Sequence, residues 1–74
     1  MEVDYTDHSL ERLVERGISK RAIREAFAHG QKKERQAEGL LRITHRKQNK
    51  KLIVIYKVLS KDKYLIITAY HDGN

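Results

Sequence analysis

Residues 8–19 have the sequence HSLERLVERGIS and determine how the N-terminal half of the chain folds. Leu10, Leu13 and Val14 recur at helical spacing, which predicts an amphipathic helix with these three side chains facing the core. Gly17 suits the left-handed residue that follows a helix, and the serine two positions later is a favoured N-cap. The stretch therefore predicts two short helices joined by three residues.

The second predicted helix extends from about Lys20 to His29 and ends at Gly30. Thr6 or Asp7 is expected to cap the first helix, because either side chain can accept from its unpaired N–H groups. The second helix has an apolar stripe formed by Ala22, Ile23, Ala26 and Phe27. Both helices are therefore expected to pack on a sheet made by the rest of the chain.

Beyond residue 30 the pattern changes to the two-residue alternation of strands. Residues 52–59 are apolar on both faces, so they are predicted to form a central strand. Residues 31–38 are polar and charged, and are predicted to be an edge strand or a loop. The remaining predictions are a lead-in at 3–5, strands at 40–47 and 64–71, turns at 48–51 and 60–63, and a tail at 72–74.

Alternation also predicts which side chains share a face of the sheet. One face of the first long strand carries Leu41, Ile43 and His45, and the other carries Arg42, Thr44 and Arg46. In the last strand, the side expected beneath the helices carries Leu65, Ile67, Ala69 and His71, and the open side carries Tyr64, Ile66, Thr68 and Tyr70. An open face with arginine, threonine and tyrosine suits a ribose-phosphate chain, because cations bind phosphates and rings stack on bases.

These elements make residues 1–74 a single α+β domain, in which an N-terminal helical hairpin packs on a three- to four-stranded antiparallel sheet. The chain has no cysteine, so neither disulfides nor thiolate metal sites stabilise its small core. We therefore expect a partner protein, or a second copy in a homodimer, to cover part of its apolar surface.

The charge of the chain favours a polyanionic partner. Sixteen Lys and Arg residues against ten Asp and Glu residues give a net charge of +6. A small basic domain is typical of nucleic-acid binding, although positive charge also serves solubility alone. No apolar run reaches the roughly 18 residues of a membrane span, and the acidic N-terminus lacks the order of a signal peptide. A cytoplasmic protein that does not enter a membrane is expected.

His8, Arg12 and Arg16 are spaced four residues apart and therefore line one side of the first helix. An imidazole beside two permanent cations suits phosphodiester chemistry, with a general acid or base next to phosphate ligands. The same spacing also occurs on a solvated helix face, where neighbouring glutamates pair with the arginines. The predicted apolar stripe places His8 and Arg12 nearly opposite the core, and Arg16 toward its edge.

The four histidines do not have the spacing of a metal site, because no two lie four residues apart on a helix. Neither a metal nor another cofactor is expected. His45 lies on an otherwise apolar strand face and is interpreted as a partly buried, hydrogen-bonded residue or a strand-end residue rather than a catalyst.

The two helices around Gly17 also resemble a helix-turn-helix, with Lys20, Arg21 and Arg24 placed to touch DNA. That motif needs a third, supporting helix, which this chain does not offer, so a helix-turn-helix regulator is the weaker alternative. The charge runs at 31–36 and 47–51 are each interpreted as a solvated loop or as a source of non-specific phosphate contacts, with RNA binding assigned to Lys50 and Lys51.

Three motifs carry a resemblance to a known family: HSLER at 8–12, ERGIS at 15–19 and IITAY at 66–70. They resemble domain-of-unknown-function family 4258 over nearly the whole chain, with one departure at Ser9, where that family more often has alanine. The family is usually grouped with the barnase–EndoU–colicin–RelE superfamily, which consists mostly of metal-independent ribonucleases and toxins of toxin–antitoxin pairs. The resemblance therefore implies a RelE-like fold and a small acidic antitoxin as partner.

The resemblance also implies cleavage of single-stranded or messenger RNA by attack of the ribose 2′-hydroxyl on the adjacent phosphate. The implied catalytic set comprises one acid or base, two phosphate-stabilising cations and two hydroxyl groups: His8, Arg12, Arg16, Thr68 and Tyr70. The implied contacts to the RNA backbone are Arg42 and Arg46.

Two hypotheses of different class remain. The first is a ribonuclease toxin, for which His8→Ala is expected to abolish cleavage while the protein stays folded. The second is a non-catalytic module that binds nucleic acid or a partner protein, and its binding is expected to survive His8→Ala. RNA cleavage in the absence of metal separates the two hypotheses.

Overall fold

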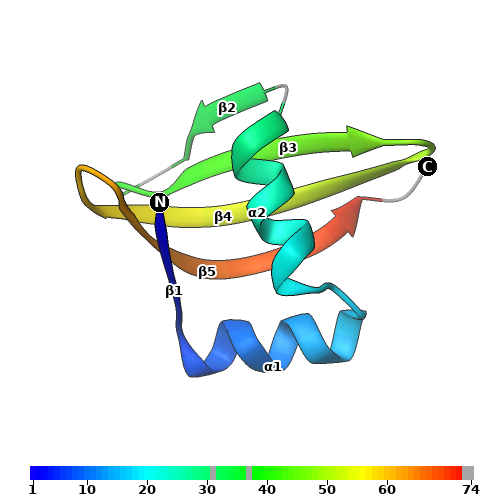
Figure 1. Cartoon of the computed structure of the whole chain (residues 1–74), viewed down its shortest axis with the longest axis horizontal. Helices are drawn as coiled ribbons and strands as arrows, with labels where there is room; N and C mark the ends of the chain where they lie inside the picture. Colours follow the sequence, from blue (N-terminus) through cyan, green and yellow to red (C-terminus); the bar gives the residue numbers. More distant parts are fainter. Residues whose placement is uncertain (31, 37, 73–74) are drawn as a thin grey trace.

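The computed structural model describes residues 1–30, 32–36 and 38–72, and confirms the α+β class. Figure 1 shows α2 crossing the strands of one sheet, while α1 runs beside β5. None of the described helices is long and apolar enough to cross a membrane. The elements in chain order are β1 (Glu2–Tyr5), α1 (Asp7–Arg16), α2 (Lys20–His29), β2 (Lys32–Arg35), β3 (Leu41–Lys47), β4 (Lys50–Ser60) and β5 (Lys63–Asp72).

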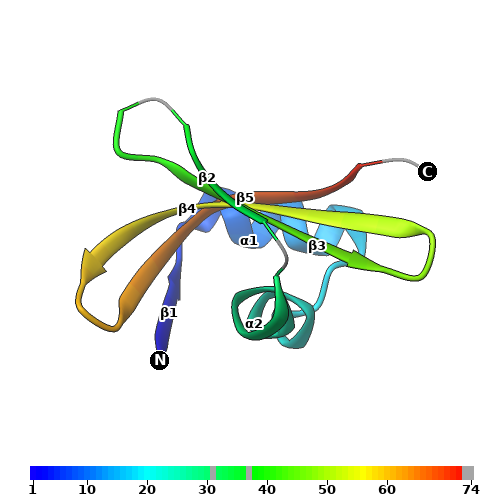
Figure 2. The same cartoon turned by 90° about the horizontal axis from the view of Figure 1, so that it is seen from above.

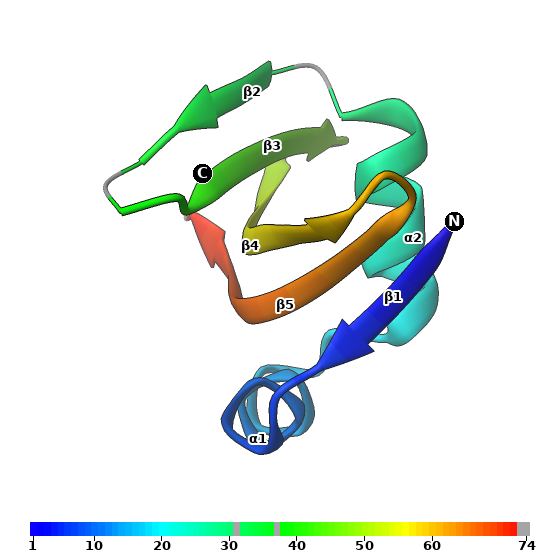
Figure 3. The ribbon, with the colours of Figure 1, turned by 90° about the vertical axis from the view of Figure 1, so that its left-hand side faces the viewer.

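The described residues form one sheet of five strands in the order β1-β5-β4-β3-β2. The pairing of β1 with β5 is parallel and the others are antiparallel, so the predicted three- to four-stranded antiparallel sheet was wrong. Residues 3–5, expected to be a lead-in, belong to β1, which lies against the outer edge of β5 (Figure 3). Four residues carry too little alternation to predict a strand, and the available edge of β5 gives them a partner.

Most of the other predicted strands are confirmed. The strand β4 lies in the middle of the sheet, and the ambiguous segment at 31–38 contains the edge strand β2. Gln31 and Ala37 of that segment lie outside the described residues, as do Gly73 and Asn74 of the predicted tail. The turn between β3 and β4 is shorter than predicted, because Lys47 pairs with Lys50.

The helix α2 packs on β3 and β4 through the predicted stripe. Ser19 caps it by accepting from Ala22 N at 3.0 Å, while Ile23 and Ala26 are fully buried. Gly30 ends α2 where the backbone approaches β3 very closely. A Cβ at this position would lie 2.5 Å from Ile43 Cγ2, so a larger residue does not fit without a shift. Figure 2 shows α2 alone beneath the sheet, so the opposite face is left uncovered by either helix.

The helix α1 contacts β5 rather than the face of the sheet. Thr6 caps it, and Gly17, at φ 65°, ends it. Of the predicted stripe only Leu13 is buried, whereas Val14 is 83% exposed and the residue buried beside Leu13 is Ser9. The predicted orientation was therefore wrong, because a helix lying along a strand edge buries the side that fits the narrow space there. The full burial of Ser9 explains why a small side chain is needed at that position.

A β-bulge changes the faces predicted for β5. Ile55 of β4 pairs with Thr68, but the next residue of β4, Tyr56, pairs with Ile66, which leaves Ile67 as an extra residue. The bulge therefore reverses the faces predicted for the residues before Ile67, whereas the residues after Ile67 keep their predicted faces. The side chains of Tyr64 and Ile66 therefore face the helices with Ala69, contrary to prediction, and the Tyr64 ring stacks on Phe27 at 5.0 Å.

The orientation of α1 is tested by a matched pair of substitutions. Leu13→Ala is expected to lower the free energy of unfolding by about 2–5 kcal/mol, because it opens a cavity in the core. Val14→Ala is expected to change it by less than about 0.5 kcal/mol, because the side chain is exposed. Urea denaturation followed by circular dichroism measures both, and a larger effect at Val14 would contradict this orientation.

Candidate functional site

The candidate site is the open face, defined here as the sheet face opposite α2. Directly paired residues of neighbouring strands lie on the same face, so the register shows which side chains meet there. Arg42 pairs with Ile55, which pairs with Thr68, and this gives one row across three strands. The described part of the open face also includes Thr44, Ile53 and Tyr70 in the next row, and Arg46, Lys51 and Asp72 in a third.

Arg16 reaches this face from the end of α1. Its Nη1 donates to Thr68 Oγ1 at 3.3 Å and to the carbonyl oxygen of Ala69 at 2.8 Å. Two members of the predicted catalytic set, Arg16 and Thr68, are therefore in direct contact. Tyr70 lies two positions along β5 on the same face. The helix α1 and the strand β5 thus contribute side chains to one surface. The orientation of α1 predicted from the sequence did not require these two elements to meet there.

Arg42 is held by Glu34 of the edge strand β2. Its Nη2 donates to Glu34 Oε1, and the two residues are directly paired in the sheet. The hydrogen bond and charge attraction of Glu34 raise the pKa of Arg42 above its usual value, and Tyr70 adds a smaller contribution in the same direction. Arg42 Nε is buried and has no hydrogen-bond partner within the described residues. Arg42 therefore presents a fixed positive charge between the hydroxyl of Tyr70 and a carboxylate.

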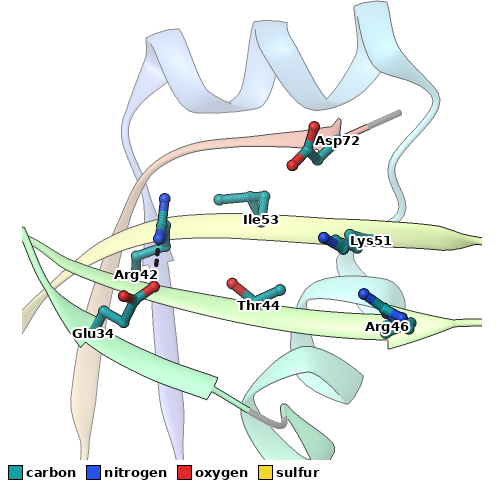
Figure 4. A pocket seen from close by; sticks show the side chains of 7 residues that line it. All are labelled: Glu34, Arg42, Thr44, Arg46, Lys51, Ile53 and Asp72. Carbon is teal, nitrogen blue, oxygen red and sulfur yellow. Dashed lines mark hydrogen bonds and ion pairs between the residues drawn. The ribbon is translucent and has the colours of Figure 1, made fainter. Parts of the chain in front are cut away.

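The middle of the open face is hollowed by about 510 Å³. Figure 4 shows side chains from β2, β3, β4 and β5 around this hollow, with α2 behind the sheet and α1 beyond the edge formed by β5. Counting only described side chains, the hollow and its α1 edge carry four cations and two carboxylates: Arg16, Arg42, Arg46, Lys51, Glu34 and Asp72. The surface therefore spans four strands with an excess of positive charge, which suits an extended polyanion.

Two residues of the predicted catalytic set are not brought to the centre of this face. Arg12 is partly buried beside α1's sheet-facing side, and its Nη1 pairs with Glu15 Oε1 at 2.8 Å. His8 is exposed and forms no hydrogen bond or ion pair within the described residues. The expectation that Arg12 lies opposite the core was therefore wrong, and the structure does not join His8 to Thr68 or Tyr70.

Lys50 and Lys51 were both predicted to contact RNA, but they lie on opposite faces. Lys51 lines the hollow, together with Arg46. Lys50 lies on the α2 side, where it lines a different pocket. Both lysines belong to β4, and successive residues of a strand point to opposite faces. The predicted turn at 48–51 gave no reason to place them on different faces.

Sequence reasoning missed two acidic residues of the hollow. Glu34 lies in the segment left open between strand and loop, and only its pairing with Arg42 identifies its position. Asp72 was placed in the tail, although it pairs with Lys51. A single carboxylate among the basic residues at 32–35 was the available signal for Glu34, and it needed the strand register to be useful. Among the described residues no cluster of three or more His, Asp or Glu side chains could hold a metal ion.

The fold and this face define a small basic α+β domain with one uncovered sheet surface. Residues 5–71 match the family described as Domain of unknown function (DUF4258), so the chain belongs to that family. No curated protein and no solved structure matches the chain. The family description carries no activity, so the open face itself has to supply the argument for function.

The charge balance of the hollow is tested by Glu34→Gln. Removing one carboxylate beside Arg42 is expected to raise the affinity for a single-stranded oligodeoxynucleotide about fivefold, since charges about 4 Å apart in water interact by about 1 kcal/mol. Fluorescence anisotropy at low salt measures this affinity. Glu11→Gln, on the exposed side of α1, changes net charge equally and is the control. An equal gain in both variants would show that only net charge matters.

Proposed function

We propose that the protein is a metal-independent endoribonuclease that binds single-stranded RNA across the open face and serves as the toxin of a toxin–antitoxin pair. The observation that carries this proposal is the row that runs from Glu34 through Arg42 and Thr68 to Arg16. It aligns a carboxylate, a guanidinium, a hydroxyl and a second guanidinium on one accessible surface. These are the groups that phosphodiester cleavage needs when no metal takes part.

The two guanidiniums are suited to hold neighbouring parts of the RNA backbone. Arg42 lies on β3 and Thr68 on β5, so the row spans two inter-strand spacings, or roughly 9.5 Å. An arginine binds a phosphate through several N–H donors and remains charged at any physiological pH. Arg46 and Lys51 extend the positive surface toward the turn between β3 and β4, and bases can stack on Tyr70.

Cleavage on this face would follow a balanced two-proton scheme. The 2′-oxygen forms a bond to phosphorus, the bond from phosphorus to the 5′-oxygen breaks, and the products are a 2′,3′-cyclic phosphate and a 5′-hydroxyl. Glu34 is placed to take the proton from the 2′-hydroxyl, Arg42 to stabilise the charged phosphorane, and Tyr70 to protonate the leaving oxygen. Arg16 and Thr68 would bind and orient the adjacent phosphate.

This assignment moves the acid–base role from His8 to groups of the open face. The reason is geometric, because a general base has to lie within hydrogen-bond reach of the proton that it removes. His8 and Arg12 stay candidates for contacts to the RNA where it leaves the sheet beside α1. A role for His8 in the proton transfers would require the helix to approach the RNA more closely.

An acidic antitoxin fits the same surface. The open face is the concentration of positive charge that such a partner would neutralise, and covering it would exclude RNA. The relationship to RelE-like toxins is part of this proposal, and it is supported by a basic face on an antiparallel run of strands. The alternative, a non-catalytic module that binds RNA or a partner, is favoured by the separation of His8 from Thr68 and Tyr70.

The proposal predicts cleavage of labelled RNA in EDTA, with cyclic phosphate ends. Glu34→Gln is expected to slow cleavage about 10²–10⁴-fold although it binds polyanions more tightly, because it removes a base and not a cation. Tyr70→Phe is expected to slow cleavage by a similar factor, and His8→Ala to leave it nearly unchanged. Denaturing gel electrophoresis with end mapping measures the rates.

The variants also separate the competing explanations. Equal cleavage by every variant would indicate a contaminating nuclease. Loss of cleavage in His8→Ala alone would return the acid–base role to that residue. Salt-sensitive RNA binding without cleavage by the wild type would contradict the enzyme proposal and favour the binding module.

A further inference from the structure

A second pocket lies on the opposite side of the sheet from the open face. It has a volume of about 230 Å³ and is lined by the first half of α2, the turn between β3 and β4 with its flanking strand residues, and the end of β5. Figure 1 shows these strand ends at one end of the sheet. We call it the hairpin-end pocket; the lining side chains that matter here are Glu25, His45, Lys47, Lys50, Leu52 and His71. None of them belongs to the row proposed for RNA cleavage.

The register places two imidazoles on either side of an aliphatic floor. His45 of β3 pairs directly with Leu52 of β4, which pairs directly with His71 of β5. Two inter-strand spacings therefore separate the histidines, or roughly 9.5 Å. A flat ring midway between them would lie about 4.8 Å from each, within the range of about 4.5–7 Å preferred by stacked aromatic rings. Leu52, which is 6% exposed, would contact its edge from below.

One polar atom in this pocket lacks a partner. His45 Nδ1 is buried and forms no hydrogen bond with any described residue. Buried polar atoms are almost always hydrogen-bonded, because leaving one unpaired costs free energy. The sequence-based interpretation of His45 as partly buried is confirmed, but the hydrogen bond expected for it is not found among the described residues. Because this nitrogen is covered, His45 contributes to the pocket through the rest of its ring.

Charged groups at the rim complement a phosphate as well as a polar ring. Lys47 Nζ is paired with Glu25 Oε1 at 3.5 Å, which joins β3 to α2 across the pocket wall. Lys50 is exposed and makes no ion pair within the described residues. Its ammonium group is therefore available to a phosphate, while Glu25 can accept from the amino or imino groups of a base.

We propose that the hairpin-end pocket binds one nucleotide, with its base between His45 and His71 over Leu52 and its phosphate at Lys50. A free mononucleotide and the terminal nucleotide of an RNA share this chemistry. The second source rests on the proposed function, because an RNA on the open face would pass Lys51 and bend around the turn to reach Lys50. The first source requires no RNA binding at all.

Imidazole signals in NMR spectra provide the test. The chain has four histidines, of which two line the pocket, so His8 and His29 are internal controls. Titration with AMP, GMP, CMP and UMP is expected to shift the signals of His45 and His71 in a saturable way, together with upfield ring-current shifts of the Leu52 methyl groups. Ribose 5-phosphate, which has no base, is expected to leave the Leu52 methyl groups in place.

Two surface variants test the assigned contacts without disturbing the core. Lys50→Gln is expected to weaken mononucleotide binding about three- to tenfold and to leave nucleoside binding unchanged. His71→Ala is expected to weaken both by a similar factor, whereas the matched variant His29→Ala has no effect. A dinucleotide or longer RNA that binds more tightly than AMP, and loses that gain in Arg42→Gln, would identify the RNA terminus as the source.

Three results would overturn the inference. These are the same shifts with inorganic phosphate alone, equal shifts of His8, or no shift at tens of millimolar nucleotide. Failure of the proposed function is distinguishable from these outcomes. If the wild type does not cleave RNA but mononucleotides still shift His45 and His71, the pocket stands and the ribonuclease proposal fails alone.

Discussion

The hydrogen bond of 2.8 Å from Arg16 Nη1 to the carbonyl oxygen of Ala69 joins the end of α1 to the part of β5 that β1 does not reach. A strand edge presents backbone groups that need partners, and β1 satisfies those of β5 only along 63–66. Beyond that point the side chain of Arg16 donates to the carbonyl oxygen of Ala69, and Thr6 N donates to the carbonyl oxygen of Ile66 at 3.5 Å where β1 ends. The orientation of α1, the burial of Ser9 and the arrival of a guanidinium at Thr68 all depend on this arrangement.

The sequence predicted correctly those parts of the fold in which a helix packs flat on one face of the sheet. The stripe of α2 and the alternation of β3 were both correct, because α2 lies flat on one face and the hydrophobic period then reports burial directly. The period failed for α1, which lies beside an edge where Ser9 fits and Leu10 does not. It also failed for the first half of β5, because Ile67 lies within an apolar run, where no residue type signals a β-bulge.

The candidate site was predictable in kind but not in composition. A basic open face with Arg42, Thr68 and Tyr70 followed from alternation, because the bulge preserves the predicted phase after Ile67. The pairing of Glu34 with Arg42 joins residues eight positions apart through strand register, which no local pattern reports. The two faces of the sheet carry separate chemistry: a cationic surface on one side, and on the other a smaller pocket lined by two imidazoles.

The central claim is that nucleic acid lies on the open face, and methyl NMR tests it most directly. Neighbouring residues of one strand report opposite faces, so a titration with non-cleavable 2′-O-methyl RNA has controls built into each strand. Shifts are expected for the open-face methyl groups of Thr44, Ile53 and Thr68. The methyl groups of the opposite face, in Ile43, Val54 and Ile66, are expected to stay in place. Shifts confined to that opposite face, or to Val14 on α1, would contradict the account.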